Sequence, residues 1–341
     1  MKKETTIYDI AKTLNISATT VSRGLQKHDT ISLKTQKRIA DTAKELGYRS
    51  NNFASNLRKQ KTNTIGVMLH ELHSSFISSV LAGIEKITAE ANYDLIIGHS
   101  SESYKKEAAN AHNFFHKRVD GLIAALAFDT EDMSHFDPFF DRNIPVVFFD
   151  RVEETSKGTK VIIDNEKAGY DATQHLIDQG CKRIAHITSN LKRNVYELRF
   201  EGFLNALKHN NIPFDDSMLF ITELTKDMCM ETMRKVINLS PLPDGIFATN
   251  DLIGAIAIQV LKENSLSVPK DIAIVGFNND ILSIITDPKL STINYPGFEL
   301  GEIAAKKLIA QLEGKEDASE NQTIIIKSDL ICRESSMRKK S

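Results

Sequence analysis

Long apolar runs, paired cysteines and a secretory leader are all missing from this sequence of 341 residues. No apolar run approaches the roughly 18–20 residues that cross a bilayer. The first residues, Met-Lys-Lys-Glu-Thr-Thr, lack the apolar segment of a signal peptide. The three cysteines, Cys181, Cys229 and Cys332, are widely spread and lack the spacing of a metal site. These absences predict a protein of the reducing cytoplasm that has no membrane partner.

Motifs for common catalytic chemistry are also missing. The sequence has no Gly-x-Gly-x-x-Gly or Walker-type loop for dinucleotide or ATP, and no Gly-x-Ser-x-Gly elbow for a serine nucleophile. His112 and His116 have the spacing of a helical zinc site, but Asn113 stands where the motif needs Glu, so solvated helix residues are expected. The stretch from His70 to His73 is expected to be a loop after a strand. We therefore expect no catalytic residues, no metal and no cofactor in a protein that is not an enzyme.

Charge is distributed very unevenly along the chain. The formal net charge is only −2, but residues 1–61 carry 13 Lys and Arg against 5 Asp and Glu, and the remainder carries 30 against 40. A basic head on an acidic body indicates that the head alone meets a polyanion, although chance clustering on a small domain is the alternative. Hydrophobic residues make up 41% of the chain, enough to build the cores of two or three domains.

The head has the apolar periodicity of three short helices. These are expected over residues 7–14, 18–25 and 32–46. Thr6 and Asp9 resemble a capping box, Ser17 can cap the second helix, and Gly47 can end the third. Two helices joined by a short turn, with a third packed against them, predict a helix-turn-helix.

One face of the second helix has the character of a DNA-reading surface. Ala18, Thr19, Ser22 and Arg23 share this face at 100° per residue. Small side chains allow close approach to a major groove, hydroxyls can bond to bases or phosphates, and Arg can form two bonds to guanine. The alternative is the polar outer face of an ordinary helical bundle.

From residue 64 onward, apolar strand-like runs alternate with helices. Strands are expected at 65–69, 94–97, 121–124 and 146–149, and then at 161–163, 184–187, 219–221, 245–248 and 272–275. Helices are expected near 76–91, 104–117, 131–142, 166–179, 195–210, 226–239 and 250–263. Such alternation predicts an α/β body with two doubly wound parallel sheets, and ligands in such folds bind beyond the carboxyl ends of strands.

Several motifs together resemble the lactose/galactose repressor (LacI/GalR) family of bacterial transcription regulators. In the head these are Ile7-Tyr-Asp-Ile-Ala-Lys12, Ile16-Ser-Ala-Thr-Thr-Val-Ser-Arg23 and Leu46-Gly-Tyr48. In the body they are Ala248-Thr-Asn-Asp251, Val275-Gly-Phe-Asn-Asn279 and Arg333-Glu-Ser335. The resemblance covers nearly the whole chain. It implies a helix-turn-helix head followed by a two-lobed, type I periplasmic-binding-protein-like body.

The resemblance also implies which residues contact DNA. The positions that read bases are Ala18, Thr19 and Arg23. The positions that contact backbone phosphates are Tyr8, Ser17, Thr20, Ser22, Ser32 and Thr35. Gly24 and Gln26 depart from the common family pattern, so the end of the second helix is expected to fray.

The linker after the head carries Phe53 and Leu57 at helical spacing, with basic residues just behind them. The resemblance implies a hinge helix that forms on DNA and places Asn51, Ala54, Leu57 and Arg58 in the minor groove. The segment is shorter than the roughly 12–15 residues that an isolated helix needs, and an apolar wedge between base pairs bends a duplex. The alternative is that both apolar side chains pack onto the body. Ser50 stands where relatives commonly carry Pro.

Domain boundaries and effector contacts follow from the same resemblance. It implies a DNA-binding domain over residues 1–49, a hinge over 50–62 and a body over 63–341. The first lobe is expected over about 63–162 and 292–322, and the second over about 163–291 and 323–341. The implied effector contacts are Phe76, Asp150, Arg199, Asn250, Asn278 and Tyr295. Asp150 as a loop cap and Arg199 as a surface ion pair are the structural alternatives for two of them.

The implied function is a homodimeric, sequence-specific repressor that binds a pseudo-palindromic operator and responds to a sugar-like effector between its lobes. The effector remains open between a free sugar, a phosphorylated sugar, another metabolite and a protein co-regulator, since Asn278 replaces a frequent Asp and Ala125 offers no polar group. The alternatives are an activator or co-repressor-dependent regulator and, from another class, a sugar-handling enzyme fused to a DNA-binding head. A transport-type binding protein lacks such a head and carries an export signal.

Overall fold

The computed structural model describes residues 5–48 and 61–338. The chain divides into two compact units, Met1–Thr62 and Asn63–Ser341, called here the head and the body, and each is described by itself. The four hinge positions predicted from the sequence, Asn51, Ala54, Leu57 and Arg58, lie outside the described residues. Across the described ranges, no helix combines the length and apolar character that crossing a membrane requires.

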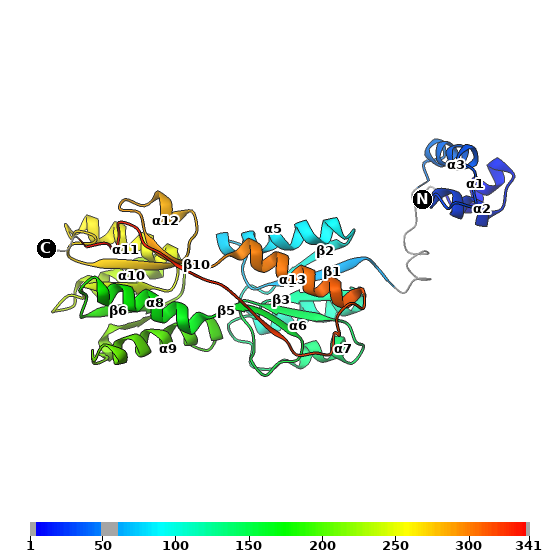
Figure 1. Ribbon diagram of the computed structural model, residues 1–341. Helices are drawn as coiled ribbons and strands as arrows, with labels where there is room; N and C mark the ends of the chain where they lie inside the picture. The colour runs from blue at the N-terminus through cyan, green and yellow to red at the C-terminus, as the bar shows by residue number, and fades with distance from the viewer. Residues whose placement is uncertain (1–4, 49–60, 339–341) are drawn as a thin grey trace. The chain divides into compact units, whose positions relative to one another are not determined.

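The head consists of three helices whose ends are fixed by local hydrogen bonds. They are α1 (Ile7–Leu14), α2 (Ala18–Leu25) and α3 (Leu33–Glu45) (Figure 1). The Asp9 carboxylate accepts from the backbone N–H and the hydroxyl of Thr6 at 2.8 and 2.7 Å, and Ser17 Oγ accepts from the Thr20 N–H at 3.0 Å. Gly47, at φ 63°, follows α3 in the left-handed conformation. The predicted helices and caps are confirmed.

A single apolar cluster holds these helices together around Ile10, Val21 and Ile39, which are fully buried. Gly24 belongs to this packing, because a Cβ atom there would lie 2.4 Å from Cδ1 of Ile39. The missing side chain lets α3 approach α2 and leaves α2 continuous to Leu25. The bulk of Ile39 fills the space that a side chain at position 24 would take, and α2 ends at Leu25 as predicted. Fraying of this end at Gly24 and Gln26 stays a prediction.

The first lobe of the body is a six-stranded parallel sheet in the order β11-β5-β4-β3-β1-β2. Its strands are β1 (Thr64–Leu69), β2 (Asp94–His99), β3 (Gly121–Ala124), β4 (Val146–Phe149), β5 (Thr159–Ile163) and β11 (Thr323–Ile326). Its helices are α5 (Ser75–Glu90), α6 (Tyr104–His116), α7 (Asp137–Phe140) and α13 (Gly297–Leu312). Figure 1 shows α5 and α13 on one face of the sheet and α6 and α7 on the other. Because a buried parallel sheet needs both faces covered, its strands are apolar along nearly their whole length.

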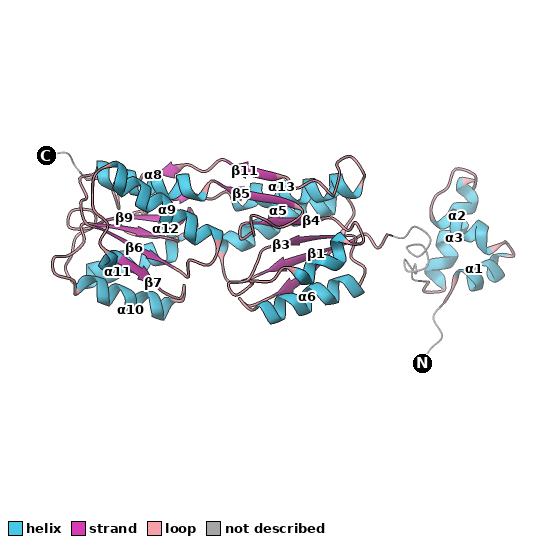
Figure 2. Ribbon diagram, turned by 90° about the horizontal axis from the view of Figure 1, so that it is seen from below, coloured by secondary structure: helices cyan, strands magenta, loops and turns pink. Residues whose placement is uncertain are grey.

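The second lobe repeats this plan in the order β12-β10-β9-β8-β6-β7, with only the β10–β12 pair antiparallel. Its strands are β6 (Ile184–Thr188), β7 (Leu219–Ile221), β8 (Gly245–Ala248), β9 (Ala273–Asn278), β10 (Ser291–Asn294) and β12 (Leu330–Ile331). Its helices are α8 (Asn165–Asp178), α9 (Asn194–His209), α10 (Lys226–Ile237), α11 (Asp251–Glu263) and α12 (Leu282–Ile285). Figure 2 shows the strands of both lobes enclosed by helices. The predicted fold class is confirmed.

Two details of the predicted body were wrong. The helix expected over residues 131–142 is a 3-10 turn (Ser134–Phe136) followed by the four-residue α7. Asp132 accepts from the Ser134 N–H and hydroxyl at 2.8 and 2.6 Å, and Pro138 lacks the N–H that a continuous helix uses.

The lobe boundaries also shift. Ser291–Asn294 pairs with β9 and therefore belongs to the second lobe, whereas Thr323–Ile326 pairs with β5 in the first. The two later crossings between lobes thus lie at 295–296 and 327–329 rather than at 291/292 and 322/323. Strand partners decide this assignment, and a local apolar run does not reveal its partner.

Candidate functional site

The predicted DNA-reading face of α2 lies largely outside the head core. Val21 and Gly24 are buried against α3, and Thr19 and Arg23 are exposed. Ala18 is half-buried at the first position of the helix, where it touches the edge of the core. The helix therefore presents Arg23 on its accessible side, with small residues beside it, as insertion into a groove requires.

The predicted phosphate-contacting residues gather at the beginnings of the helices. The Ser17 and Thr20 hydroxyls lie 2.8 Å apart at the start of α2, and those of Ser32 and Thr35 lie 2.9 Å apart at the start of α3. The helix dipole and free N–H groups at such positions favour an anion. Of the remaining two, Ser22 is half-buried on α2, and the Tyr8 side chain on α1 is 71% exposed.

In the body, three predicted effector residues meet at the boundary between the lobes. Asp150 follows β4 with a φ of 58°, and its Oδ1 accepts a hydrogen bond of 3.0 Å from the Tyr295 hydroxyl. Tyr295 follows β10, on the segment that crosses between the lobes. The ring of Phe76, at the start of α5, lies 4.3 Å from the Tyr295 ring between centroids. All three residues are buried.

Arg199 reaches the same region from α9 in the second lobe. Its Nε donates to Asn165 Oδ1 at 2.9 Å and its Nη1 donates to the Thr249 carbonyl at 3.0 Å. The guanidinium lies 3.5 Å from the centroid of the Phe277 ring. Arg199 is only 4% exposed, so the alternative of a surface ion pair was wrong.

Close packing of α8 and α9 sets the position of Arg199. A Cβ atom at Gly169 would lie 2.3 Å from the Arg199 carbonyl oxygen, and one at Gly202 would lie 2.0 Å from that of Glu166. Only glycine permits backbones to approach this closely. The helix that carries Arg199 is therefore held firmly against α8, whose first residue, Asn165, is also its hydrogen-bond partner.

The other two predicted contacts are placed by backbone features. Asn250 caps α11, with Oδ1 accepting from the Ile253 N–H at 2.9 Å. Asn278 ends β9 at a φ of 107°, in the left-handed region. Both residues are half-buried, at the carboxyl ends of neighbouring strands of the second sheet.

Sequence reasoning missed a second set of contacts, centred on Arg151. Its Nη1 donates to both carboxylate oxygens of Glu102 at 2.8 and 2.7 Å, and its Nη2 donates to the Tyr196 hydroxyl of α9 at 3.1 Å. The guanidinium also lies 4.1 Å from the centroid of the Phe128 ring. Its position directly after Asp150, at the end of a strand, could have marked Arg151 as a candidate site residue. Its partner Glu102 is 49 positions away, so the local sequence does not indicate this contact.

Further polar contacts join the lobes beside Arg151. The Asn194 side chain accepts from the Val152 N–H at 3.0 Å and donates to the Asp150 carbonyl at 3.1 Å. Arg193 donates to the Thr130 carbonyl at 2.5 Å, and Lys192 pairs with Glu131 at 2.7 Å. The lobes are thus closed on each other in this structure.

Burial is the main cause of the pKa shifts of the ionisable groups at the lobe boundary. It raises the pKa of Asp150, although Arg151, Arg199 and the Tyr295 hydroxyl act in the opposite direction. Burial, together with the Asp150 charge, raises the pKa of Tyr295 well above its usual value. Burial lowers the pKa of Arg199. Buried ionisable groups are therefore concentrated where the two lobes meet, an arrangement that can bind a polar ligand.

Comparisons with known proteins agree with this architecture. Residues 6–51 match the family of bacterial regulatory proteins, lacI family, and residues 173–336 match a periplasmic binding protein-like domain. Catabolite control protein A of Priestia megaterium is 32% identical over 304 residues, covering 89% of this chain and 91% of that protein.

Two solved structures share the fold. The Lac repressor dimer bound to operator and the anti-inducer ONPF has a TM-score of 0.87 at 23% identity, covering 98% of this chain and 100% of that one. The complex of the transcriptional regulator CelR with cellobiose has a TM-score of 0.73 at 24% identity, covering 97% and 100%. The chain therefore belongs to the lacI family of bacterial regulatory proteins, which are DNA-binding regulators of transcription.

Proposed function

We propose that this protein is a homodimeric repressor whose affinity for a pseudo-palindromic operator is set by a sugar or sugar derivative bound between its lobes. It acts in the cytoplasm and performs no catalytic step. The observation that carries this proposal is the convergence of Asp150, Arg199 and Tyr295 at the lobe boundary. A carboxylate, a guanidinium and a phenol beside aromatic faces match a hydroxyl-rich ring. The cellobiose complex of CelR supports this class of effector.

DNA reading is assigned to the head. Thr19 and Arg23 face the base edges from α2, with Ala18 allowing close approach, and the hydroxyls at the starts of α2 and α3 contact phosphates. Leu57 of the hinge inserts into the minor groove. The operator-bound Lac repressor dimer supports this arrangement.

Dimer formation is assigned to a face of the body that includes α12. Ile281, Ile284 and Ile285 are 56%, 47% and 66% exposed there, an unusual concentration of large apolar side chains on a surface. Figure 1 shows α12 on the same side of the body as α5. A second copy packed on this side buries these isoleucines and brings two heads to one operator.

The regulatory mechanism follows from the closed lobe boundary. Asp150, Arg199, Phe76 and Tyr295 are all buried, so an effector replaces some of their mutual contacts and binds one lobe arrangement better than another. Such differential binding shifts the population of the two arrangements. The arrangement of the lobes sets the separation of the paired hinges and so the affinity for operator.

The decisive experiment selects genomic fragments with the purified full-length protein and then measures binding to the recovered sites at several salt concentrations. We expect sequence-selective binding that weakens steeply with salt, because phosphate contacts release counterions. The genes beside the sites suggest candidate sugars, which are screened by shifts in melting temperature. Arg199→Met serves as the matched control, expected to bind operator normally but to lose the sugar response. No selective binding to any duplex, with or without sugars, refutes the proposal.

A further inference from the structure

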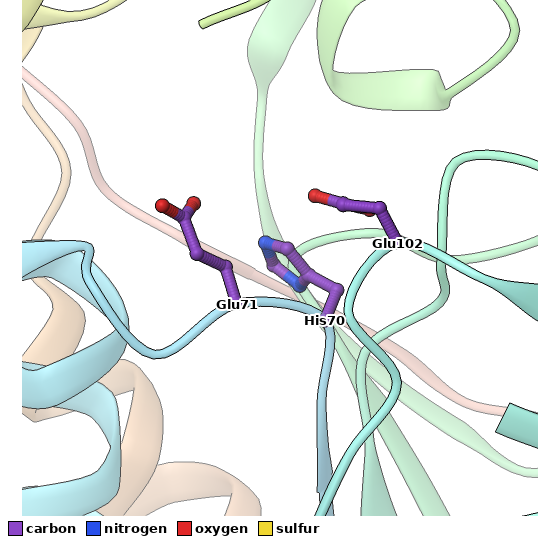
Figure 3. Close-up of side chains that lie close together, drawn as sticks. All are labelled: His70, Glu71 and Glu102. Carbon is purple, nitrogen blue, oxygen red and sulfur yellow. The ribbon is translucent and has the colours of Figure 1, made fainter. Parts of the chain in front are cut away.

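A cluster of three side chains at the end of the first sheet plays no part in the predicted effector contacts. His70 and Glu71 directly follow β1, and Glu102 lies in the loop after β2. One potential ligand atom of each lies within 4.8 Å of the other two. Figure 3 shows His70 between the two glutamates, with all three side chains extending to the same side of the loops that carry them.

Backbone hydrogen bonds hold the two loops in fixed register. The Glu102 N–H donates to the His70 carbonyl at 3.2 Å, and the Ser100 N–H donates to the Leu69 carbonyl at 2.9 Å. The second loop turns sharply through left-handed residues Ser101 and Glu102, at φ 49° and 59°. The cluster is therefore assembled before any ligand arrives.

One ring nitrogen of His70 is buried without a hydrogen bond to any described residue. The residue is only 3% exposed, and its Nδ1 has no hydrogen-bond partner in the part of the chain that the structure describes. An unpaired buried polar group costs about 1–3 kcal/mol, so it requires a reason. Imidazole nitrogens are among the commonest ligands of metal ions in proteins.

The two carboxylates supply negative charge and defined orientation. Glu102 accepts two hydrogen bonds from Arg151 and one of 3.1 Å from the Phe128 N–H, so its carboxylate is fixed in place. A cation between the two glutamates relieves their repulsion, and metal-ligating carboxylates usually accept such outer hydrogen bonds.

We propose that His70, Glu71 and Glu102 bind a divalent first-row transition-metal ion, with water completing its coordination. One imidazole and two carboxylates suit Zn²⁺, Mn²⁺ or Co²⁺, whereas Mg²⁺ and Ca²⁺ prefer oxygen ligands alone. The sequence-based expectation of an ordinary loop at His70–His73 did not include Glu102, which only the fold brings to this place. Because Arg151 joins Glu102 to Tyr196 of the other lobe, the ion lies next to a contact between the lobes.

The test uses full-length protein stripped of metal, in a His112→Gln, His116→Gln background. That exposed pair on α6 has Nε2 atoms 2.9 Å apart and can chelate metal without any functional site. Co²⁺ binding is followed by visible absorption and Zn²⁺ binding by calorimetry. We expect one equivalent of each ion to bind and raise the melting temperature, while Mg²⁺ at the same concentration has no effect.

Substitutions within this background decide the assignment. Glu71→Gln and His70→Gln are each expected to weaken Co²⁺ binding at least ~10-fold, whereas Glu85→Gln, an exposed acid on α5, leaves it unchanged. Glu71 is only partly buried, so its variant tests the site even if His70→Gln fails to fold. Unchanged affinity in Glu71→Gln, or no stoichiometric binding in the background protein, overturns the proposal. Operator binding plays no part in this test, so its failure leaves the proposed repressor function intact.

Discussion

The hydroxyl of Tyr295 donates a 3.0 Å hydrogen bond to the buried carboxylate of Asp150, across 145 residues of sequence. Tyr295 lies on a segment that crosses between the lobes, and Asp150 ends a strand of the first lobe. The bond therefore reports on the closed arrangement of the lobes. It also occupies the carboxylate that we assign to the effector.

Tyr295→Phe is expected to destabilise the body, because it leaves the Asp150 carboxylate buried without this donor. A loss of about 1–3 kcal/mol in the free energy of unfolding is expected from urea titration. Tyr93→Phe, which removes a half-buried hydroxyl elsewhere in the first lobe, is the control and should cost less. In an Asp150→Asn background the Tyr295→Phe cost should shrink markedly. Equal costs in both backgrounds contradict the assigned coupling.

The packing of Gly24 against Ile39 predicts that the effect of Gly24→Ala on the stability of the head changes sign when Ile39 is replaced by Val. Gly24→Ala alone should destabilise the head, since the new methyl group meets Cδ1 of buried Ile39. In an Ile39→Val background, which removes that methyl group, the same change should stabilise α2 by up to ~1 kcal/mol through helix propensity. Hydrogen exchange of residues 5–48 in the full-length protein measures both effects. A destabilising Gly24→Ala in the Ile39→Val background disproves the steric explanation.

Arg23→Ala should reduce discrimination between operator and mutated operator by about 1–3 kcal/mol, the usual value of a bidentate contact to a base. Lys37→Ala removes the same charge from the exposed surface of α3 and is the matched control. It should weaken binding to all duplexes about equally and lower the salt dependence. Binding assays on paired operator sequences separate these outcomes, and equal discrimination in both variants argues against base reading by Arg23.

Leu57→Ala should leave the protein folded but weaken operator binding sharply and reduce DNA bending, because the minor-groove wedge is lost. This prediction comes from the sequence, since residue 57 lies outside the described ranges. Affinity and fluorescence-based bend angles are measured together on one operator. If the variant binds and bends the operator as the wild type does, Leu57 is not the minor-groove wedge.

His186 is expected to make the body less stable as the pH becomes acidic. Burial among Phe200, Phe203 and Phe247 lowers the pKa of His186 from its ordinary value of 6.5 to about 3. The unfolded chain therefore binds a proton that the folded chain excludes. Stability is complete above about pH 6.5 and falls as the pH drops toward 3, by up to ~1.4 kcal/mol per unit.

The pH slope of His186→Phe is the direct measure of this effect. Urea titrations between pH 5 and 7 should show a smaller slope for the variant than for the wild type. The absolute stability of the variant is not diagnostic, because the Phe247 carbonyl also loses its 3.1 Å partner at His186 Nδ1. Identical slopes in the two proteins assign the pH dependence to other groups.

Much of the candidate site was visible in the sequence. Phe76, Asp150, Arg199 and Tyr295 were named from motif positions, and the structure brings them together at the lobe boundary. Arg151 and Glu102 were missed, because neither residue shows its partner 49 positions away. Gly169 and Gly202 allow α9 to pack closely on α8. Their role could not be predicted from the sequence, because it depends on the backbone of a distant residue that each glycine contacts.

The sequence by itself determined the local elements: the capped helices of the head and the alternating strands and helices of the body. These depend on interactions within a few residues, such as the Thr6–Asp9 capping box and the apolar periods of each element. Only the tertiary structure decided that β10 joins the sheet of the second lobe and β11 the sheet of the first. It also decided which side chains of different loops come into contact. Strand pairing and the cluster of His70, Glu71 and Glu102 depend on residues distant in the chain, whose encounter is set by the packing of the whole body.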